Sequence, residues 1–252
     1  MDGKLNRDGD IGMEKINAFV KNELSGWKLW ELLWIAISTA TILVLSIYWG
    51  ERLVGTISAI SGVVCVVMTG KGKVSSYIFG MVNTVLYAYI AYGAKYYGDV
   101  MLNLLYYVPM NVVGWVMWNK HINAQTKEVE KKQMTGKWRI LVFLGAALGV
   151  YLYGLILKKM GGNLPFIDSI TTVLSVVAQI LCVKRFMEQW VLWIIINVAS
   201  VIMWIMAFFN GGESIATLIM WSVFLLNAVF MFVKWNRESR GDRKSTRLNS
   251  SH

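Results

Sequence analysis

The chain has 252 residues and a net charge of +10, with 56% hydrophobic and only 16% charged residues. Soluble domains carry about 25% charged residues, so this composition excludes an ordinary soluble protein. The long apolar stretches described next also leave no room for a sizeable soluble domain.

Eight stretches that are nearly free of Asp, Glu, Lys and Arg divide the chain. A hydrocarbon core about 30 Å thick requires roughly 20 mostly apolar residues in a helix, so each stretch can cross a bilayer. We therefore predict an all-α integral membrane protein with about eight transmembrane spans. The stretches are 32–50, 53–70, 74–94, 100–119, 140–157, 166–183, 189–212 and 214–233.

The connections between these stretches are short and divide the chain into seven segments. The tail has no apolar periodicity, so we expect it to be disordered, as either a native tail or a foreign extension. The segments are a cytoplasmic N-terminal segment (1–28), an extra N-terminal helix (29–50), a first three-helix bundle (51–119), a basic cytoplasmic loop (120–137), a linker helix (138–160), a second three-helix bundle (161–236) and the tail (237–252).

Basic residues are distributed unevenly between the two sides of this arrangement. If both termini are cytoplasmic, all of the 25 basic residues but Arg52, Lys95, Lys158 and Lys159 lie on the cytoplasmic side. Positively charged loops remain inside, so eight spans with cytoplasmic ends are predicted. The basic excess is thus a topology signal with some attraction to the lipid bilayer, and does not indicate nucleic-acid binding.

The second half of the chain resembles the first at a spacing of about 115 residues, as in transporters with internal repeats. One span, 140–157, separates the two three-span units, so both units enter the membrane in the same orientation. The sequence therefore predicts parallel repeats. The matched pairs include Lys71 and Lys184, Tyr77 and Trp190, Asn83 and Asn197, Asn111 and Asn227, and Trp118 and Trp235.

Amides occur inside the spans although charges are nearly excluded from them. An amide without a partner in hydrocarbon costs several kcal/mol, so these side chains should face the bundle interior. For each amide, a hydrogen bond between helices is as reasonable as a contact with substrate. Asn103 fits neither of the two aromatic faces described next and is assigned to packing. The amides are Asn83, Asn103, Asn111, Gln179, Asn197 and Asn227.

Two helices combine aromatic and polar side chains on one face. Trp190, Trp193 and Asn197 are spaced for one face of one helix, and Tyr77, Gly80, Asn83 and Tyr87 for one face of the matching helix. This pattern is typical of a site for a flat ring that carries polar groups. Trp190 could instead belong to an interfacial aromatic belt. Thr172 shares a face with Gln179 and is a further lining candidate.

Catalytic and metal-binding patterns are not found in the sequence. His121 lies in the basic loop and His252 in the tail, and no nucleotide-binding or metalloprotease motif is present. We therefore predict no catalytic residues, no metal site and no cofactor. The spans also hold almost no carboxylate at depth, which argues against strong ion coupling.

These motifs resemble the PnuC family of nicotinamide riboside transporters, distant relatives of the SWEET sugar carriers. The resemblance covers about residues 50–237 and includes the run from Asp168 to Gln179. It implies two three-helix bundles joined by one linker helix, a 3+1+3 arrangement, with 29–50 as an extra N-terminal helix. It also implies a central substrate site between the bundles with alternating access, formed by Trp193, Asn197, Gln179, Trp190, Tyr77, Asn83, Tyr87, Gly80, Thr172, Asn111 and Asn227.

The same resemblance implies vitamin uptake for NAD biosynthesis. Nicotinamide riboside would cross the bacterial inner membrane by facilitated diffusion, and a cytoplasmic nicotinamide riboside kinase would retain it. A homo-oligomer is expected. Alternatives are a carrier of thiamine, riboflavin or a sugar. From other classes, the alternatives are a channel and an intramembrane enzyme, and the enzyme would need carboxylates, His or metal ligands at depth.

Overall fold

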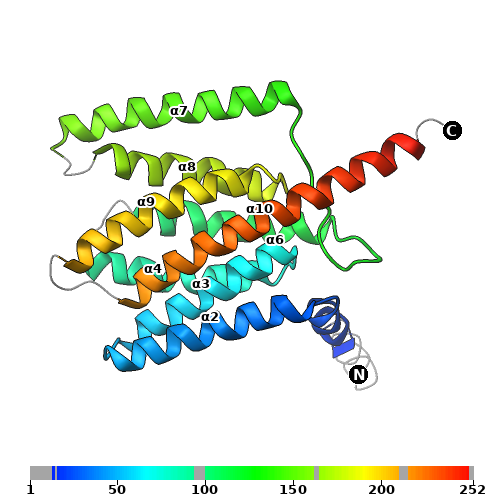
Figure 1. Cartoon of the computed structure of the whole chain (residues 1–252), viewed down its shortest axis with the longest axis horizontal. Helices are drawn as coiled ribbons and strands as arrows, with labels where there is room; N and C mark the ends of the chain where they lie inside the picture. Colours follow the sequence, from blue (N-terminus) through cyan, green and yellow to red (C-terminus); the bar gives the residue numbers. More distant parts are fainter. Residues whose placement is uncertain (1–12, 15, 94–99, 162–164, 210–214, 250–252) are drawn as a thin grey trace, which may run out of the picture.

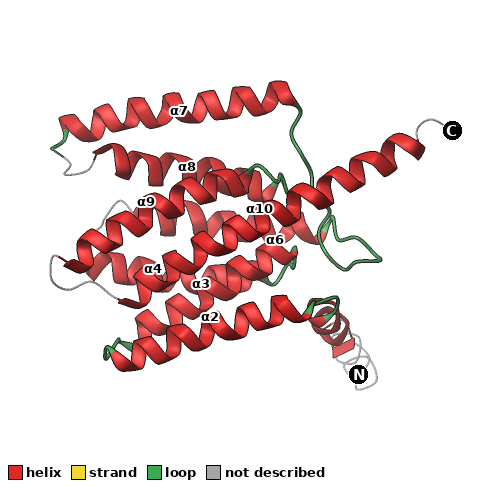
Figure 2. Ribbon diagram, viewed as in Figure 1, coloured by secondary structure: helices red, strands yellow, loops and turns green. Residues whose placement is uncertain are grey.

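The computed structural model describes residues 13–14, 16–93, 100–161, 165–209 and 215–249. These residues are almost entirely helical, as predicted, and the long helices run side by side (Figures 1 and 2). They are α2 (Leu29–Tyr48), α3 (Leu53–Lys71), α4 (Ser76–Gly93), the π-helical segment η1 (Leu102–Tyr107), α6 (Val108–Asn119), α7 (Gly136–Lys159), α8 (Pro165–Val183), α9 (Gln189–Phe209) and α10 (Ile215–Asn249).

Six of the described helices are long and apolar enough to cross a bilayer. They are α2, α3, α7, α8, α9 and α10. The predicted spans 74–94 and 100–119 also form helices, but these two are not among the six. Helix α4 has 18 residues and contains Asn83 and four tyrosines, which lower its hydropathy.

The predicted span 100–119 is divided by a change of helix type. The segment η1 is wound as a π-helix, and α6 follows it with a proline in its first turn. Pro109 has no backbone N–H, and its ring would clash with the carbonyl four residues earlier in a regular α-helix. The wider π-turn before the proline relieves this conflict, since π-bulges insert one residue into the helical ladder.

Helix packing follows the predicted repeat. Helix α3 packs against α4 and α10, and α8 in the second half packs against α9 and α6. Helices α4 and α6 also pair, as do α9 and α10. In Figure 1, α2 and α7 lie at opposite edges, with α2 against α3 and α7 against α8. Most of these contacts therefore have a counterpart in the other half, although α2 also packs against α10.

The turns after α3 and α8 have the same backbone conformation at matched positions. Gly72 and Arg185 both adopt positive φ, at 86° and 66°. In each turn the next amide returns to a carbonyl five residues back: Lys73 N to Met68 O and Phe186 N to Leu181 O, both at 2.9 Å. This is the Schellman pattern that ends many helices. Arginine adopts a conformation in the second turn that glycine adopts more readily.

Two tryptophans form reciprocal hydrogen bonds between the halves of the chain, each donating to a backbone carbonyl of the other half. The indole Nε1 of Trp118 in α6 donates to the Cys182 carbonyl at the end of α8, at 3.1 Å. The indole Nε1 of Trp235 in α10 donates to the Gly70 carbonyl at the end of α3, at 2.8 Å. Both rings are fully buried. Each half thus supplies the donor for a carbonyl of the other.

The loop between α6 and α7 connects the two turns. Val129 N donates to Gly72 O, and Lys132 N donates to Arg185 O, each at 2.9 Å. Lys132 O in turn accepts from Met187 N at 2.8 Å, within a single parallel bridge between Lys132 and Phe186. The predicted loop 120–137 is therefore an ordered strap across both halves.

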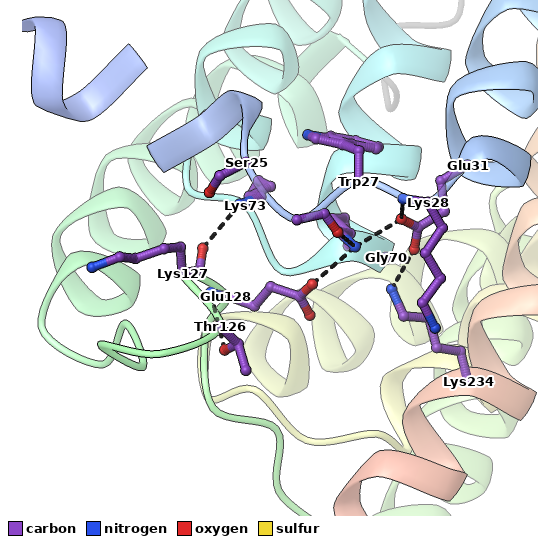
Figure 3. A network of polar contacts seen from close by, with 12 residues as sticks. Ser25, Trp27, Lys28, Glu31, Gly70, Lys73, Thr126, Lys127, Glu128 and Lys234 are labelled. Atoms are coloured by element: carbon purple, nitrogen blue, oxygen red, sulfur yellow. Dashed lines mark hydrogen bonds and ion pairs between the residues drawn. The ribbon is translucent and has the colours of Figure 1, made fainter. Parts of the chain in front are cut away.

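An ion-pair network at this end joins α2, α3, α10 and the loop (Figure 3). Glu31 is 1% exposed and accepts from Lys71 at 2.7 Å and from Lys234 at 2.8 Å. Lys71 also pairs with Glu128 at 3.0 Å. Burial alone would raise the pKa of Glu128, but Lys131, Lys234 and Lys71 more than offset it and hold that pKa below its usual value. Glu31, Lys71, Glu128 and Lys234 therefore each have an opposite charge beside them.

Helix α10 continues beyond the boundary expected at 236. The tail predicted to be disordered from 237 is helical to Asn249, and residues 250–252 lie outside the described part. Glu238 pairs with Lys131 of the loop, and Ser239 Oγ donates to Trp235 O at 2.6 Å. These polar contacts extend the helix without the apolar periodicity on which the sequence-based expectation relied.

Replacing Trp118 or Trp235 should destabilise the protein. We expect Trp118→Phe and Trp235→Phe each to lower the free energy of unfolding by about 1–3 kcal/mol, because each removes the indole donor of a carbonyl. The loss should be smaller for Trp118→Phe, because the Cys182 carbonyl also accepts from Arg185 N at 2.8 Å. Thermal unfolding of the purified protein in detergent measures this. Trp138→Phe is the control, since Trp138 is 60% exposed. An equal loss of stability in the control would contradict the assignment.

Candidate functional site

A cavity of about 180 Å³ lies between the two halves. This is several times the roughly 30 Å³ that one water molecule occupies in the liquid, so the cavity can hold an organic ligand. Its walls come from α3, α4, η1 and α6 of the first half and from α8, α9 and α10 of the second. Helices α2 and α7 do not contribute to its lining.

Ten of the eleven predicted site residues line this cavity, and Thr172 does not. Its neighbours Thr171 and Ser175 line the wall instead. Thr171, Ser175 and Gln179 repeat every four residues, whereas the prediction used a spacing of three and then four. The ten residues are Trp193, Asn197, Gln179, Trp190, Tyr77, Asn83, Tyr87, Gly80, Asn111 and Asn227.

Three of the cavity amides are held by protein partners. Asn83 Nδ2 donates to Ser58 O at 2.8 Å, and Asn227 Nδ2 donates to Val66 O at 3.0 Å. Asn111 Nδ2 donates to Thr84 Oγ1 at 3.3 Å. Each of these bonds fixes the orientation of its amide. The interhelical role and the substrate role considered for these residues can therefore coexist.

Other polar atoms on the wall have no protein partner. The indole Nε1 atoms of Trp190 and Trp221 and the Oδ1 atom of Asn227 are buried without a hydrogen bond. Among the described residues, the side chains of Asn197 and Gln179 also have no hydrogen-bonding partner in the protein. Buried polar groups are rarely left unpaired, so these donors and acceptors mark places for polar groups of a ligand.

Trp190 belongs to the cavity wall and not to an interfacial belt. Its side chain is 3% exposed and meets Trp235 edge to face, with ring centroids 5.7 Å apart. Tyr77 meets Trp118 in the same way at 5.1 Å. These four rings pack in one cluster beside the exchanged indole bonds. The cluster also contacts Val129 of the strap.

Asn103 was assigned to packing, and the structure corrects that assignment. It is buried and lines the cavity from η1. The π-turn alters the register of side chains relative to α6, so the α-helical spacing used for the prediction does not apply there. Ser200, Trp204 and Trp221 also line the wall and were missed. Trp204 and Ser200 continue the face of Trp193 and Asn197, a signal that the sequence did contain.

The described part of the cavity wall carries no acidic or basic side chain. Among the described residues that line the cavity, none is Asp, Glu, Lys, Arg or His. Among the described residues there is also no cluster of His, Cys, Asp or Glu that could hold a metal ion. The chemistry available to a ligand is aromatic stacking and hydrogen bonding to amides, hydroxyls and indoles.

Comparisons with known proteins agree on one family. The model of the nicotinamide mononucleotide transporter family matches residues 52–237. The nicotinamide riboside transporter PnuC of Neisseria mucosa is 38% identical over 226 residues, covering 87% of this chain and 86% of that protein. The same transporter of Haemophilus influenzae is 32% identical over 216 residues, covering 85% and 92%. A crystal structure of the vitamin B3 transporter PnuC superimposes with a TM-score of 0.80 at 37% identity, covering 88% of this chain and 97% of that one.

Gly62 makes room for the Asn83 amide. A Cβ at position 62 would lie 2.7 Å from Asn83 Nδ2 and 2.9 Å from Phe224 Cζ. Gly62→Ala should break the bond from Asn83 to Ser58, a loss of about 1–3 kcal/mol that outweighs the roughly 1 kcal/mol gained in helix propensity. We expect a lower thermal midpoint in detergent. Gly145→Ala is the control, because nothing lies within 4 Å of its Cβ, and should raise the midpoint. A raised midpoint for Gly62→Ala together with a lowered midpoint for Gly145→Ala would contradict this packing.

Proposed function

The chain belongs to the nicotinamide mononucleotide transporter family, and we propose that it carries nicotinamide riboside, a precursor of NAD, across the bacterial inner membrane. Membership of this family makes the protein a membrane transporter and not an enzyme. The observation that carries the substrate proposal is the uncharged cavity with aromatic rings and amides between the two halves.

The uncharged wall favours the riboside over the mononucleotide. A phosphate dianion that leaves water without a cation to receive it suffers a desolvation cost of several kcal/mol. No such cation is among the described residues that line this cavity. The ribose hydroxyls and the carboxamide of the riboside are neutral and match the amides on the wall. The positively charged pyridinium ring can stack on an indole, an attraction of about 0.5–2 kcal/mol.

Trp193 and Asn197 are the proposed centre of recognition. They lie about one turn apart on α9, so a ring stacked on Trp193 places its polar groups near Asn197. Gln179 faces them from α8 across the cavity. The remaining proposed contacts are Trp190, Tyr77, Asn83, Tyr87, Gly80, Asn111 and Asn227. Thiamine, riboflavin and a sugar remain the alternative substrates, since an aromatic and amide-lined wall suits each of them.

We propose facilitated diffusion with alternating access around this cavity. The described residues of the wall include no carboxylate through which a proton or sodium gradient could act, which supports passive transport. Phosphorylation by a cytoplasmic nicotinamide riboside kinase would then retain the product, because the charged mononucleotide does not fit the uncharged wall.

Eight spans in a 3+1+3 arrangement with an extra N-terminal helix form the proposed membrane architecture. The matched packing of α3, α4 and α6 with α8, α9 and α10 supports two bundles, with α7 as the linker. Helices α4 and α6 then span the membrane inside the bundles. Positive residues at the strap end support cytoplasmic termini. We also propose a homo-oligomer, as the resemblance to the PnuC family implies, and the mass of the purified assembly tests this.

Substrate binding tests the site directly. Trp193→Ala should lose stacking worth about 1–3 kcal/mol by analogy with bases on aromatic rings. Asn197→Leu should leave a polar group of the ligand unpaired, at about 1–3 kcal/mol. Each change should weaken binding of nicotinamide riboside about tenfold or more in calorimetry. Trp138→Ala and Asn119→Leu, both outside the cavity, are the matched controls.

The same titration compares nicotinamide riboside with its mononucleotide, thiamine, riboflavin and glucose. Only the riboside should bind tightly to the unmodified protein. Normal binding by well-folded Trp193 and Asn197 variants would place the site elsewhere, and tight binding of a different vitamin would change the substrate.

Transport energetics follow from the uncharged wall. Uptake into empty proteoliposomes should equilibrate with the outside concentration and require neither ATP nor an ion gradient. Radiolabelled nicotinamide riboside measures this. Accumulation well above the outside level, abolished by a protonophore, would reveal a coupling site and overturn the proposal.

Topology is tested by cysteine labelling in intact cells. A cysteine placed at Gly161, after α7, should react with a membrane-impermeant maleimide, whereas one placed at Gln125 in the strap should not. The unmodified chain provides the background from Cys65 and Cys182, which lie within helices. Labelling at Gln125 in intact cells would reverse the proposed orientation.

A further inference from the structure

A short helix precedes α2 and crosses its direction. Residues 13–14 and 16–24 are helical, and in Figure 1 this helix is seen nearly end-on near the N-terminus while α2 runs along the page. It lies at the same end of the bundle as the strap. A helix in this position has the direction of the membrane surface, because α2 is one of the candidate spans.

One side of this helix is fixed against the protein. Phe19 packs on Trp115 of α6, with ring centroids 5.6 Å apart. The carbonyl of Asn22 accepts from the buried ammonium of Lys73 at 2.7 Å, as expected for a cation at the C-terminus of a helix. Glu23 accepts from the backbone N and the hydroxyl of Ser75. Figure 3 shows the connection that follows, with Ser25 and Trp27 beside Lys73. These contacts fix the rotation of the helix about its axis.

A second side of the helix is apolar and exposed. Met13, Ile16, Val20 and Leu24 recur every three to four residues, so they form one stripe. Their exposed fractions are 66%, 63%, 46% and 71%. The stripe neither packs on the bundle nor matches the polar side, where Glu14 and Lys21 are exposed. An ordered apolar stripe of this kind needs a partner that is itself apolar.

The stripe is continuous with the surface of α2 that faces lipid. Leu29 and Leu33, in the first turns of α2, are exposed along with Trp30. Trp138 at the start of α7 is exposed at the same end of the bundle. Exposed tryptophans at the ends of spans are typical of the boundary between lipid headgroups and acyl chains. The stripe therefore meets the bilayer at the depth of its interface.

We propose that the helix at residues 13–24 is an interfacial lipid-binding element, with Met13, Ile16, Val20 and Leu24 inserted between the lipid headgroups. Its charges indicate what kind of lipid contact this is. The segment 13–24 has two acidic residues, Glu14 and Glu23, and two basic residues, Lys15 and Lys21. Attraction to anionic lipid therefore contributes little, and burial of the apolar stripe drives the contact.

Spin labels on the full chain in lipid nanodiscs test the proposal. Single cysteines are introduced on the stripe (Ile16→Cys, Val20→Cys) and, as controls, on the polar side (Glu14→Cys, Lys21→Cys). All four side chains are exposed, so the variants should fold. Accessibility to oxygen, which concentrates in the bilayer, is compared with accessibility to a water-soluble nickel chelate. The unmodified chain gives the background from the native cysteines.

The stripe labels should be accessible to oxygen and protected from nickel, and the polar-side labels should show the reverse. This pattern should be the same in nanodiscs of phosphatidylcholine alone and of phosphatidylcholine with phosphatidylglycerol. Stripe labels open to nickel would place the helix in water. Stripe labels protected from both reagents would show that protein covers the stripe, such as a second copy of the chain. Insertion only with phosphatidylglycerol would show an electrostatic contact. Each of these three results overturns the proposal.

Discussion

A polar group inside a bilayer has no water to pair with, and the arrangement of this protein follows from that constraint. The carbonyls at the ends of α3 and α8 are paired by indoles from the opposite half. Amides on the cavity wall are held by carbonyls and hydroxyls of neighbouring helices. Some of the buried polar atoms without a partner, those of Tyr77, Trp190, Trp221 and Asn227, are on the wall of the cavity, whereas others, such as those of Ser38, Ser46 and Gln189, lie elsewhere. Substrate in transit can satisfy the groups on the wall.

The same constraint separates the charged side chains from the cavity along the length of the bundle. Ionised side chains gather at the end where the strap lies, where Glu31, Lys71 and Lys234 pair closely. The described residues of the cavity wall include no Asp, Glu, Lys, Arg or His. The ion pairs join α2, α3, α10 and the strap, so they hold together elements that belong to both halves. Charge thus serves assembly at one end, and neutral donors and acceptors remain for recognition in the middle.

Much of the fold and of the cavity could be predicted from the sequence, because charge-free stretches and repeated amides are properties of residue types. Asn103 and Thr172 show where this reasoning stops. The π-turn before Pro109 changes the register of Asn103, and a choice between spacings of three and four separates Thr172 from Thr171. The strap was missed for another reason. Its bonds join backbone atoms of Val129 and Lys132 to the two turns, and backbone bonds leave no pattern in side chains.

The indole hydrogen bonds between the halves also limit when the two halves can join during biosynthesis. The Gly70 carbonyl belongs to an early helix, whereas its donor, Trp235, lies near the end of the last apolar stretch. Because translation proceeds from the N-terminus, this hydrogen bond can form only after α10 has been synthesised. A chain that ends before residue 235 lacks the indole that pairs with the Gly70 carbonyl.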